Sequence, residues 1–294
     1  MRNGMQTARA SSWLVWCIAC SLLARPALAG DGVRLKVVRN SFIVVPVTVN
    51  GLGPFPFLLD TGADTTLIDP ALAKELGLQP VDRLWLATVN GERAVPRVWL
   101  RTLAIGPATA EQVEALIAEM PSGEVKTRIR GMVGLNFLAR FNYLIDFRQE
   151  RIQFETGEDL AGRLLGRRLP FKADSGLIVV EAQPSPSSSE LWRLKLDSGA
   201  AGLVLFREPR YPGFEPDRFS GTVEVRTHSA TSTNRNGRLR NLRVGDAMFD
   251  NLPTAVIPSP QARATGDGLL PASIFQSVYV NHRHRYVIFN PQTP

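Results

Sequence analysis

The fold of this chain is decided by the stretch Phe57-Leu58-Leu59-Asp60-Thr61-Gly62-Ala63 and by a second stretch of the same pattern, Leu194-Lys195-Leu196-Asp197-Ser198-Gly199-Ala200. In each stretch an apolar run leads to an aspartate, a hydroxyl residue, a glycine and an alanine. The first run predicts a buried strand that ends at a turn. A carboxylate at the end of a buried strand is costly unless hydrogen bonds or a partner satisfy it. Two such carboxylates indicate a common site, where each changes the proton affinity of the other.

The two motifs resemble the catalytic signatures of the aspartic proteases. The longer run Val49-Asn50-Gly51-Leu52-Gly53-Pro54-Phe55-Pro56-Phe57-Leu58-Leu59-Asp60 is similar to the bacterial retropepsin-like branch of that family. The resemblance implies that Asp60 and Asp197 form a catalytic dyad. It also implies that Thr61, Gly62, Ser198 and Gly199 support the dyad, with each hydroxyl residue bonded to the opposite loop. The implied reaction is hydrolysis of a peptide or protein substrate by an activated water, without a metal or another cofactor.

The second half of the chain repeats the plan of the first. Asp197 stands 137 positions after Asp60. Four further landmarks recur in the same order, namely 42–45 and 177–180, 103–106 and 242–245, 131–138 and 268–275, and 151–154 and 286–289. Such a repeat indicates a duplicated β unit. Together with the resemblance, it predicts a mostly β, two-lobed acid-protease (retropepsin-like) β-barrel fold, internally duplicated, with short helices. We expect lobe one at residues 30–156 and lobe two at residues 157–294.

The first 29 residues have the layout of a secretory signal peptide. Arg2 and Arg9 precede the apolar segment 13–23, and Ala27-Leu28-Ala29 offers small residues before Gly30. This pattern predicts export with cleavage after Ala29, to a bacterial periplasm or beyond. An uncleaved membrane anchor is disfavoured because the apolar run is short and Arg25 breaks it. A lipoprotein attached through Cys20 is the other open alternative.

Composition limits the chemistry of the mature chain. Both cysteines, Cys17 and Cys20, lie in the leader, so no disulfide, thiol nucleophile or cysteine-bound metal is expected after cleavage. The formal charge of +7 includes three leader arginines, which leaves +7 − 3 = +4. The remaining arginines show no aromatic stacking pattern, so we expect solvated surface and no nucleic-acid partner.

Local signals predict several elements. Asn50-Gly51 indicates a tight hairpin, and Asp69, Pro70 and Gly77 are the start and stop of a short helix. A hairpin around Asn90 and Gly91 is a possible flap over a cleft, with an ordinary surface hairpin as the alternative. The low-complexity segment 183–189 predicts a surface loop.

Other functional classes fit the sequence less well. His282 and His284 lack an identifiable third ligand, so a surface hairpin is preferred to a zinc site. No Gly-x-Ser-x-Gly elbow is present. The main rival is an exported protease-fold protein that binds peptides or a partner with little turnover, because Pro271 replaces an expected glycine in lobe two. Since one chain supplies both aspartates, a monomer is expected to be sufficient.

Ala63 and Ala200 lead to a prediction about pH. In pepsin-like relatives a hydroxyl residue often stands at this position and donates to a catalytic carboxylate, which favours the charged form. Because alanines replace that hydroxyl residue here, we expect a pH optimum for cleavage that is less acidic than that of pepsin. Peptide cleavage measured from about pH 3 to 8 tests this. A clear maximum at strongly acid pH would contradict it.

Overall fold

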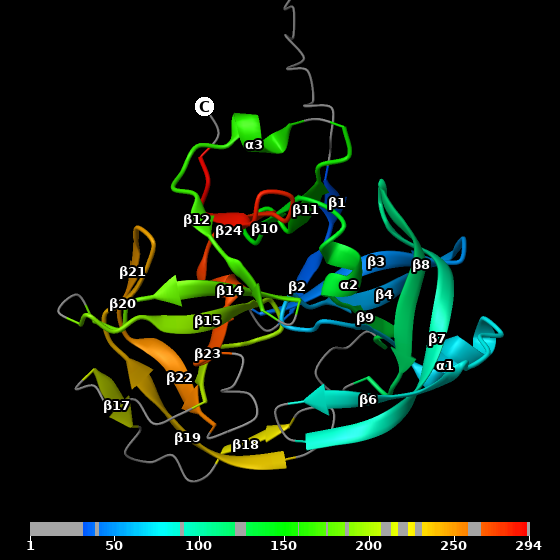
Figure 1. Ribbon diagram of the computed structural model, residues 1–294, viewed down its shortest axis with the longest axis horizontal. Coiled ribbons are helices and arrows are strands. Elements are labelled where there is room, and N and C mark those ends of the chain that lie inside the picture. The colour runs from blue at the N-terminus through cyan, green and yellow to red at the C-terminus, as the bar shows by residue number, and fades with distance from the viewer. Residues whose placement is uncertain are drawn as a thin grey trace, which may run out of the picture. The chain divides into compact units, whose positions relative to one another are not determined.

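The structure is a computed structural model, shown in Figure 1. It describes residues 32–38, 41–88, 91–120, 128–157, 159–174, 176–185, 188–206, 213–216, 223–226, 231–257 and 266–292. Residues Gly32–Pro294 form one compact unit. The predicted leader with its cleavage site at Ala29 lies outside the described residues, and so does Asn90. Among the described residues, no helix is long and apolar enough to span a bilayer.

Lobe one is built on an eight-stranded sheet. Its strands are β2 (Lys36–Val38), β3 (Phe42–Val49), β4 (Leu52–Leu59), β5 (Thr66–Ile68), β6 (Asp82–Thr88), β7 (Gly91–Ile105), β8 (Ala108–Ile117) and β9 (Gly131–Val133). They lie in the order β2-β3-β4-β9-β5-β8-β7-β6, and the pairs β4–β9 and β5–β8 are parallel. Two short helices accompany the sheet, α1 (Pro70–Glu75) and α2 (Leu135–Leu138).

Lobe two repeats this arrangement. Its main strands are β13 (Lys172–Asp174), β14 (Leu177–Ala182), β15 (Trp192–Asp197), β16 (Leu203–Leu205), β17 (Phe214–Pro216), β18 (Val223–Arg226), β19 (Thr231–Leu239), β22 (Leu252–Val256) and β23 (Gly268–Pro271). Their order is β13-β14-β15-β23-β16-β22-β19-β17, with β18 paired to β19. The pairs β15–β23 and β16–β22 are parallel, as their counterparts in lobe one are. The mostly β fold with short helices and the internal duplication, both expected from the sequence, are therefore confirmed.

A third sheet of six strands takes strands from both lobes (Figure 1). It contains β1 (Val33–Arg34), β10 (Tyr143–Asp146), β11 (Arg151–Phe154), β12 (Leu169–Pro170), β24 (Ser277–Asn281) and β25 (Tyr286–Phe289). Its central pair joins β10 of lobe one to β24 of lobe two over four residues. The helix α3 (Leu160–Arg163) lies in the connection between the lobes. Because this sheet joins three strands of each half side by side, the lobe boundary at residues 156 and 157 stays a prediction.

The turns lie at the positions that the local sequence predicted. Asn50 and Gly51 both have positive φ, 52° and 82°, as a type I′ hairpin requires. The carboxylate of Asp69 accepts a hydrogen bond from the backbone N–H of Leu72 and caps α1, while Gly77 ends the helix region at φ 63°. In lobe two the edge of the sheet is split, and β20 (Leu242–Val244) pairs with β21 (Ala247–Phe249) around a turn at Gly245.

Each lobe has a β-hairpin that extends from its sheet. In lobe one, β6 and β7 pair from Asp82 opposite Arg97 to Thr88 opposite Gly91. Its predicted role as a flap stays a prediction, because Asn90 is not described. In lobe two, β18 and β19 form the equivalent hairpin. No strand was expected for residues 231–238, because their polar sequence does not alternate between apolar and polar residues.

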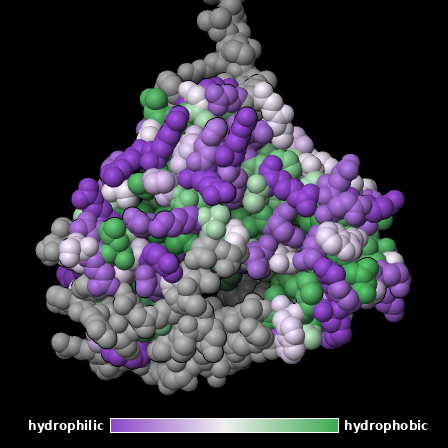
Figure 2. Space-filling model, in the orientation of Figure 1, coloured by the Kyte–Doolittle hydropathy of each residue, from purple (hydrophilic) through white to green (hydrophobic). Residues whose placement is uncertain are grey.

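The surface agrees with the interpretation of the basic residues as solvated. Figure 2 shows one face on which hydrophilic side chains are mixed with smaller hydrophobic areas. The arginines singled out as solvated are all exposed, namely Arg163, Arg167, Arg168, Arg235, Arg238, Arg240 and Arg243.

His282 differs from the expected surface position. The turn between β24 and β25 is present, but the imidazole of His282 packs against the rings of Tyr143 and Phe171, each with centroids 5.7 Å away. Its Nε2 is buried without a hydrogen-bond partner. His284 is exposed. Both histidines lie in the turn after β24 ends at Asn281, where the strand rule that puts residues two apart on one face does not apply, and the two imidazoles do not form a pair.

Burial lowers the pKa of His282 to about 4, and this gives a pH-dependent stability term. As pH falls below about 6.5, His282 becomes protonated in the unfolded chain but stays neutral in the folded protein. The free energy of unfolding therefore decreases by up to about 3 kcal/mol near pH 4. The variant His282→Phe removes this term. Its stability relative to the wild type, measured by urea unfolding, is expected to increase steadily from pH 7 to 4. His284→Gln changes an exposed histidine of the same turn and is the control. Parallel pH curves for His282→Phe and the wild type would contradict the prediction.

Candidate active site

Asp60 and Asp197 stand at equivalent points of the two lobes. Asp60 follows the last residue of β4, and its backbone N–H donates to the carbonyl of Val133 in β9 at 3.0 Å. Asp197 is the last residue of β15, opposite Pro271 of β23. The side chain of Asp197 is buried, and Asp60 is partly exposed. The buried strands therefore deliver both carboxyl groups to one place, as the two motifs predicted.

Reciprocal hydrogen bonds connect the two motifs. The hydroxyl of Thr61 donates to the carbonyl of Leu196 at 2.9 Å and accepts from the backbone N–H of Ser198 at 3.0 Å. The hydroxyl of Ser198 donates to the carbonyl of Leu59 at 2.8 Å and accepts from the backbone N–H of Thr61 at 3.0 Å. Both hydroxyl residues are buried, at 1% and 0% exposure. Each lobe thus supplies hydrogen bonds that the strand end of the other lobe requires.

Gly62 and Gly199 allow the turns to approach. A Cβ on Gly62 would lie 2.5 Å from Cγ of Asp197, and one on Gly199 would lie 3.0 Å from Oδ2 of Asp60. No other residue fits Gly62 without displacing the carboxyl group of Asp197. The same glycines donate to the aspartate of their own motif, Gly62 N–H to Oδ1 of Asp60 at 2.8 Å and Gly199 N–H to Oδ1 of Asp197 at 2.7 Å.

The two carboxyl groups differ in proton affinity. Burial raises the pKa of Asp60, while the N–H of Gly62 and a hydrogen bond with Asp197 lower it in part. Burial and then the charge of Asp60 raise the pKa of Asp197 well above its ordinary value, and the shared hydrogen bond raises it further against the effect of the Gly199 N–H. Because the shared bond acts in opposite directions on the two groups, the pKa of Asp197 is raised further than that of Asp60, and the pair titrates as a unit.

Asp60 and Asp197 thus form a pair of adjacent carboxyl groups between two duplicated β lobes. Residues 45–137 match the family model described as aspartyl protease. The matched segment includes the Asp60 motif and ends in α2, and it confirms the resemblance that the motifs indicated. The second motif lies beyond the matched residues.

Two other comparisons are less informative. Among solved structures, the chain is similar to a retropepsin-like aspartic protease from Rickettsia conorii. The identity is 19%, the TM-score is 0.30, and the alignment covers 42% of this chain and 86% of that chain. No curated protein matches the chain at a significant level.

The predicted pair of aspartates and the four residues expected to support it lie together. Further residues near them were not expected from the sequence. Asn136 of α2 binds Thr66 of β5, next to the Asp60 motif. In lobe two the nearly buried Lys195 occupies the position, two residues before the aspartate, that Leu58 occupies in lobe one. This exchange could have been found by aligning the two motifs. No group of three or more potential metal ligands lies together within the described residues.

The reciprocal bonds give a stability prediction. Thr61→Val leaves the carbonyl of Leu196 and the N–H of Ser198 without their buried partner, so the free energy of unfolding is expected to fall by about 2–4 kcal/mol. Ser198→Ala should have a similar effect by symmetry. Thr254→Val is the matched control, because its buried hydroxyl donates to the carbonyl of Leu252 in its own strand. Chemical denaturation measures all three. Equal losses in Thr61→Val and Thr254→Val would contradict a special role for the bonds between lobes.

Proposed function

We propose that this protein is an exported aspartic endopeptidase whose single chain carries the complete dyad of Asp60 and Asp197. The observation that carries the proposal is the close approach of these two carboxyl groups, held by the reciprocal hydrogen bonds of Thr61 and Ser198. The matched family model supports a protease-type function in general. The particular dyad, the peptide substrate and the monomeric state belong to this proposal.

The unequal proton affinities suggest a division of labour. The charged Asp60 takes a proton from a water whose oxygen attacks the scissile carbonyl carbon, while protonated Asp197 donates its proton to the carbonyl oxygen. When the tetrahedral intermediate collapses, the C–N bond breaks, the amine nitrogen takes the proton from Asp60, and the remaining hydroxyl returns a proton to Asp197. The dyad ends in its starting state, without a covalent intermediate.

Export is proposed from the leader pattern of residues 1–29, which predicts a mature chain that starts at Gly30 in the periplasm or outside the cell. A monomer is proposed because both motifs and both halves of the six-stranded sheet come from one chain. Pro271 does not argue against activity, since it continues β23 in register with Asp197.

The test compares the full chain, expressed with its leader, with Asp60→Asn and Asp197→Asn. Each protein is incubated with a diverse peptide library, and cleavage is measured by mass spectrometry. Each substitution removes a proton-transfer group, so kcat/KM is expected to fall by about 10²–10⁴-fold. The double variant should lose no more than that, because the two residues act as one unit. Asp246→Asn, an exposed aspartate paired with Arg167, is the control.

Two results would oppose the proposal. Full activity in one of the two single variants would exclude a shared dyad. A folded wild type that retains peptides without cutting them would support the rival function, a peptide-binding protein with the protease fold.

A further inference from the structure

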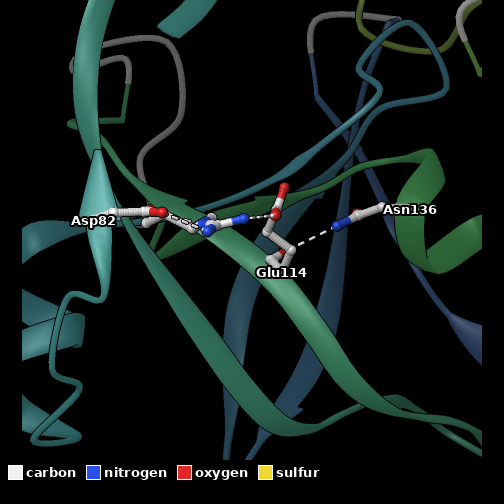
Figure 3. Close-up of polar contacts among 4 residues, drawn as sticks. Asp82, Glu114 and Asn136 are labelled. Carbon is white, nitrogen blue, oxygen red and sulfur yellow. Dashed lines mark hydrogen bonds and ion pairs between the residues drawn. The ribbon is translucent and has the colours of Figure 1, made fainter. Parts of the chain in front are cut away.

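A chain of polar contacts crosses lobe one from the base of the β6–β7 hairpin to the helix α2 (Figure 3). Arg97 of β7 donates from Nε to Oδ1 of Asp82 at 2.8 Å and pairs again with Oδ2 of Asp82 at 2.5 Å. Its other terminal nitrogen donates to Oε2 of Glu114 in β8 at 3.0 Å. The backbone carbonyl of Glu114 accepts from Nδ2 of Asn136 at 2.7 Å. Three strands and α2 are thereby connected. We call the contacts among Asp82, Arg97, Glu114, Asn136 and Thr66 the lobe-one relay.

The far end of the relay reaches the Asp60 motif. Oδ1 of Asn136 accepts from both the backbone N–H of Thr66, at 3.0 Å, and its hydroxyl, at 2.7 Å. The Thr66 hydroxyl accepts from the backbone N–H of Gly134 at 3.3 Å. The backbone N–H of Asn136 donates to the carbonyl of Asp64 at 2.9 Å. Asn136 therefore fixes the segment that follows the catalytic turn.

A small apolar core fills the space beside the relay. It contains Leu58, two residues before Asp60, and Met132 of β9. The hairpin residues Leu84 and Leu86 pack against this core, and so does Ala63 of the Asp60 motif. The hairpin and the Asp60 motif therefore contact one and the same apolar cluster.

In the described part of lobe two, three of the corresponding positions carry residues that cannot make these bonds. The paired registers place Leu203 where lobe one has Thr66, and Pro253 where it has Glu114. They also place Pro271 at the position of Gly134. Leucine and proline side chains form no hydrogen bonds, and Pro271 lacks the N–H that Gly134 donates. The hydroxyl acceptor and the N–H donor are thus replaced together, and the two lobes support their aspartates differently.

We propose that Arg97 and Asn136 are positioning residues, which anchor the lobe-one hairpin to the Asp60 motif and so fix the hairpin for substrate binding. This inference rests on the proposed function, because it assigns the hairpin of lobe one to the substrate. Neither residue contacts the carboxyl groups of the dyad. Their effect should therefore appear in substrate binding and leave the protonation of the dyad unchanged.

The experiment measures kcat and KM for one cleaved peptide with Arg97→Met, Glu114→Gln and the wild type. Methionine keeps the apolar stem of Arg97 but removes both ion pairs. Glu114→Gln weakens the ion pair and keeps the backbone carbonyl that binds Asn136. In both variants KM is expected to rise about tenfold, with kcat within about threefold and the pH profile of kcat unchanged. Arg240→Met is the matched control, because Arg240 makes a two-point pair with Glu215 in lobe two.

Hydrogen exchange of the β6 and β7 amides provides a second measurement that does not need activity. Exchange in these strands is expected to be about tenfold faster in Arg97→Met than in the wild type and unchanged in Arg240→Met. Equal KM and equal exchange in Arg97→Met and Arg240→Met would overturn the inference while the wild type still cleaves peptides. An inactive wild type would instead overturn the proposed function, and hydrogen exchange would still decide whether the relay anchors the hairpin.

Discussion

The structure depends on the four hydrogen bonds that Thr61 and Ser198 exchange between the lobes. Each hydroxyl satisfies a carbonyl and an N–H at a buried strand end, where an unsatisfied backbone group would cost about 1–3 kcal/mol. These bonds form only if both lobes reach the same place in the same orientation. The pair β10–β24 meets that requirement, because it joins the two halves into one sheet.

The same contact places two acidic groups where both are difficult to ionise. Backbone N–H groups of Gly62 and Gly199 stabilise negative charge, but burial dominates and raises both pKa values, and the charge of Asp60 raises that of Asp197 further. Bringing the two acidic groups together therefore lowers the stability of the folded protein. A side chain at Gly62 or Gly199 would collide with the carboxyl group of the opposite motif. This cost is acceptable because the rest of the molecule has an extensive apolar core that spans both lobes.

The duplication is faithful in topology and divergent in chemistry. Strand order and parallel pairs agree between the lobes, because the backbone hydrogen bonds that define them do not depend on side chains. Around that common frame, Thr66, Glu114 and Gly134 of lobe one correspond to Leu203, Pro253 and Pro271 of lobe two. Lys195 in place of Leu58 is a further difference beside the dyad. The two sides of the site are therefore chemically distinct although their backbones correspond.

The sequence by itself determined the features that depend on near neighbours. The buried strands that end at Asp60 and Asp197, the Asn50-Gly51 turn, the cap of α1 at Asp69 and the repeat of the β unit all follow from local pattern and spacing. Only the tertiary structure decided that the pKa of Asp197 is raised further than that of Asp60, that His282 packs against Tyr143 and Phe171, and that Arg97 is connected through Glu114 to Asn136. These features depend on burial and on contacts between residues far apart in the chain, which no local pattern encodes. The β18–β19 hairpin belongs to the same group, because the polar sequence of β19 has no apolar period and its place is set by pairing with β17 and β22.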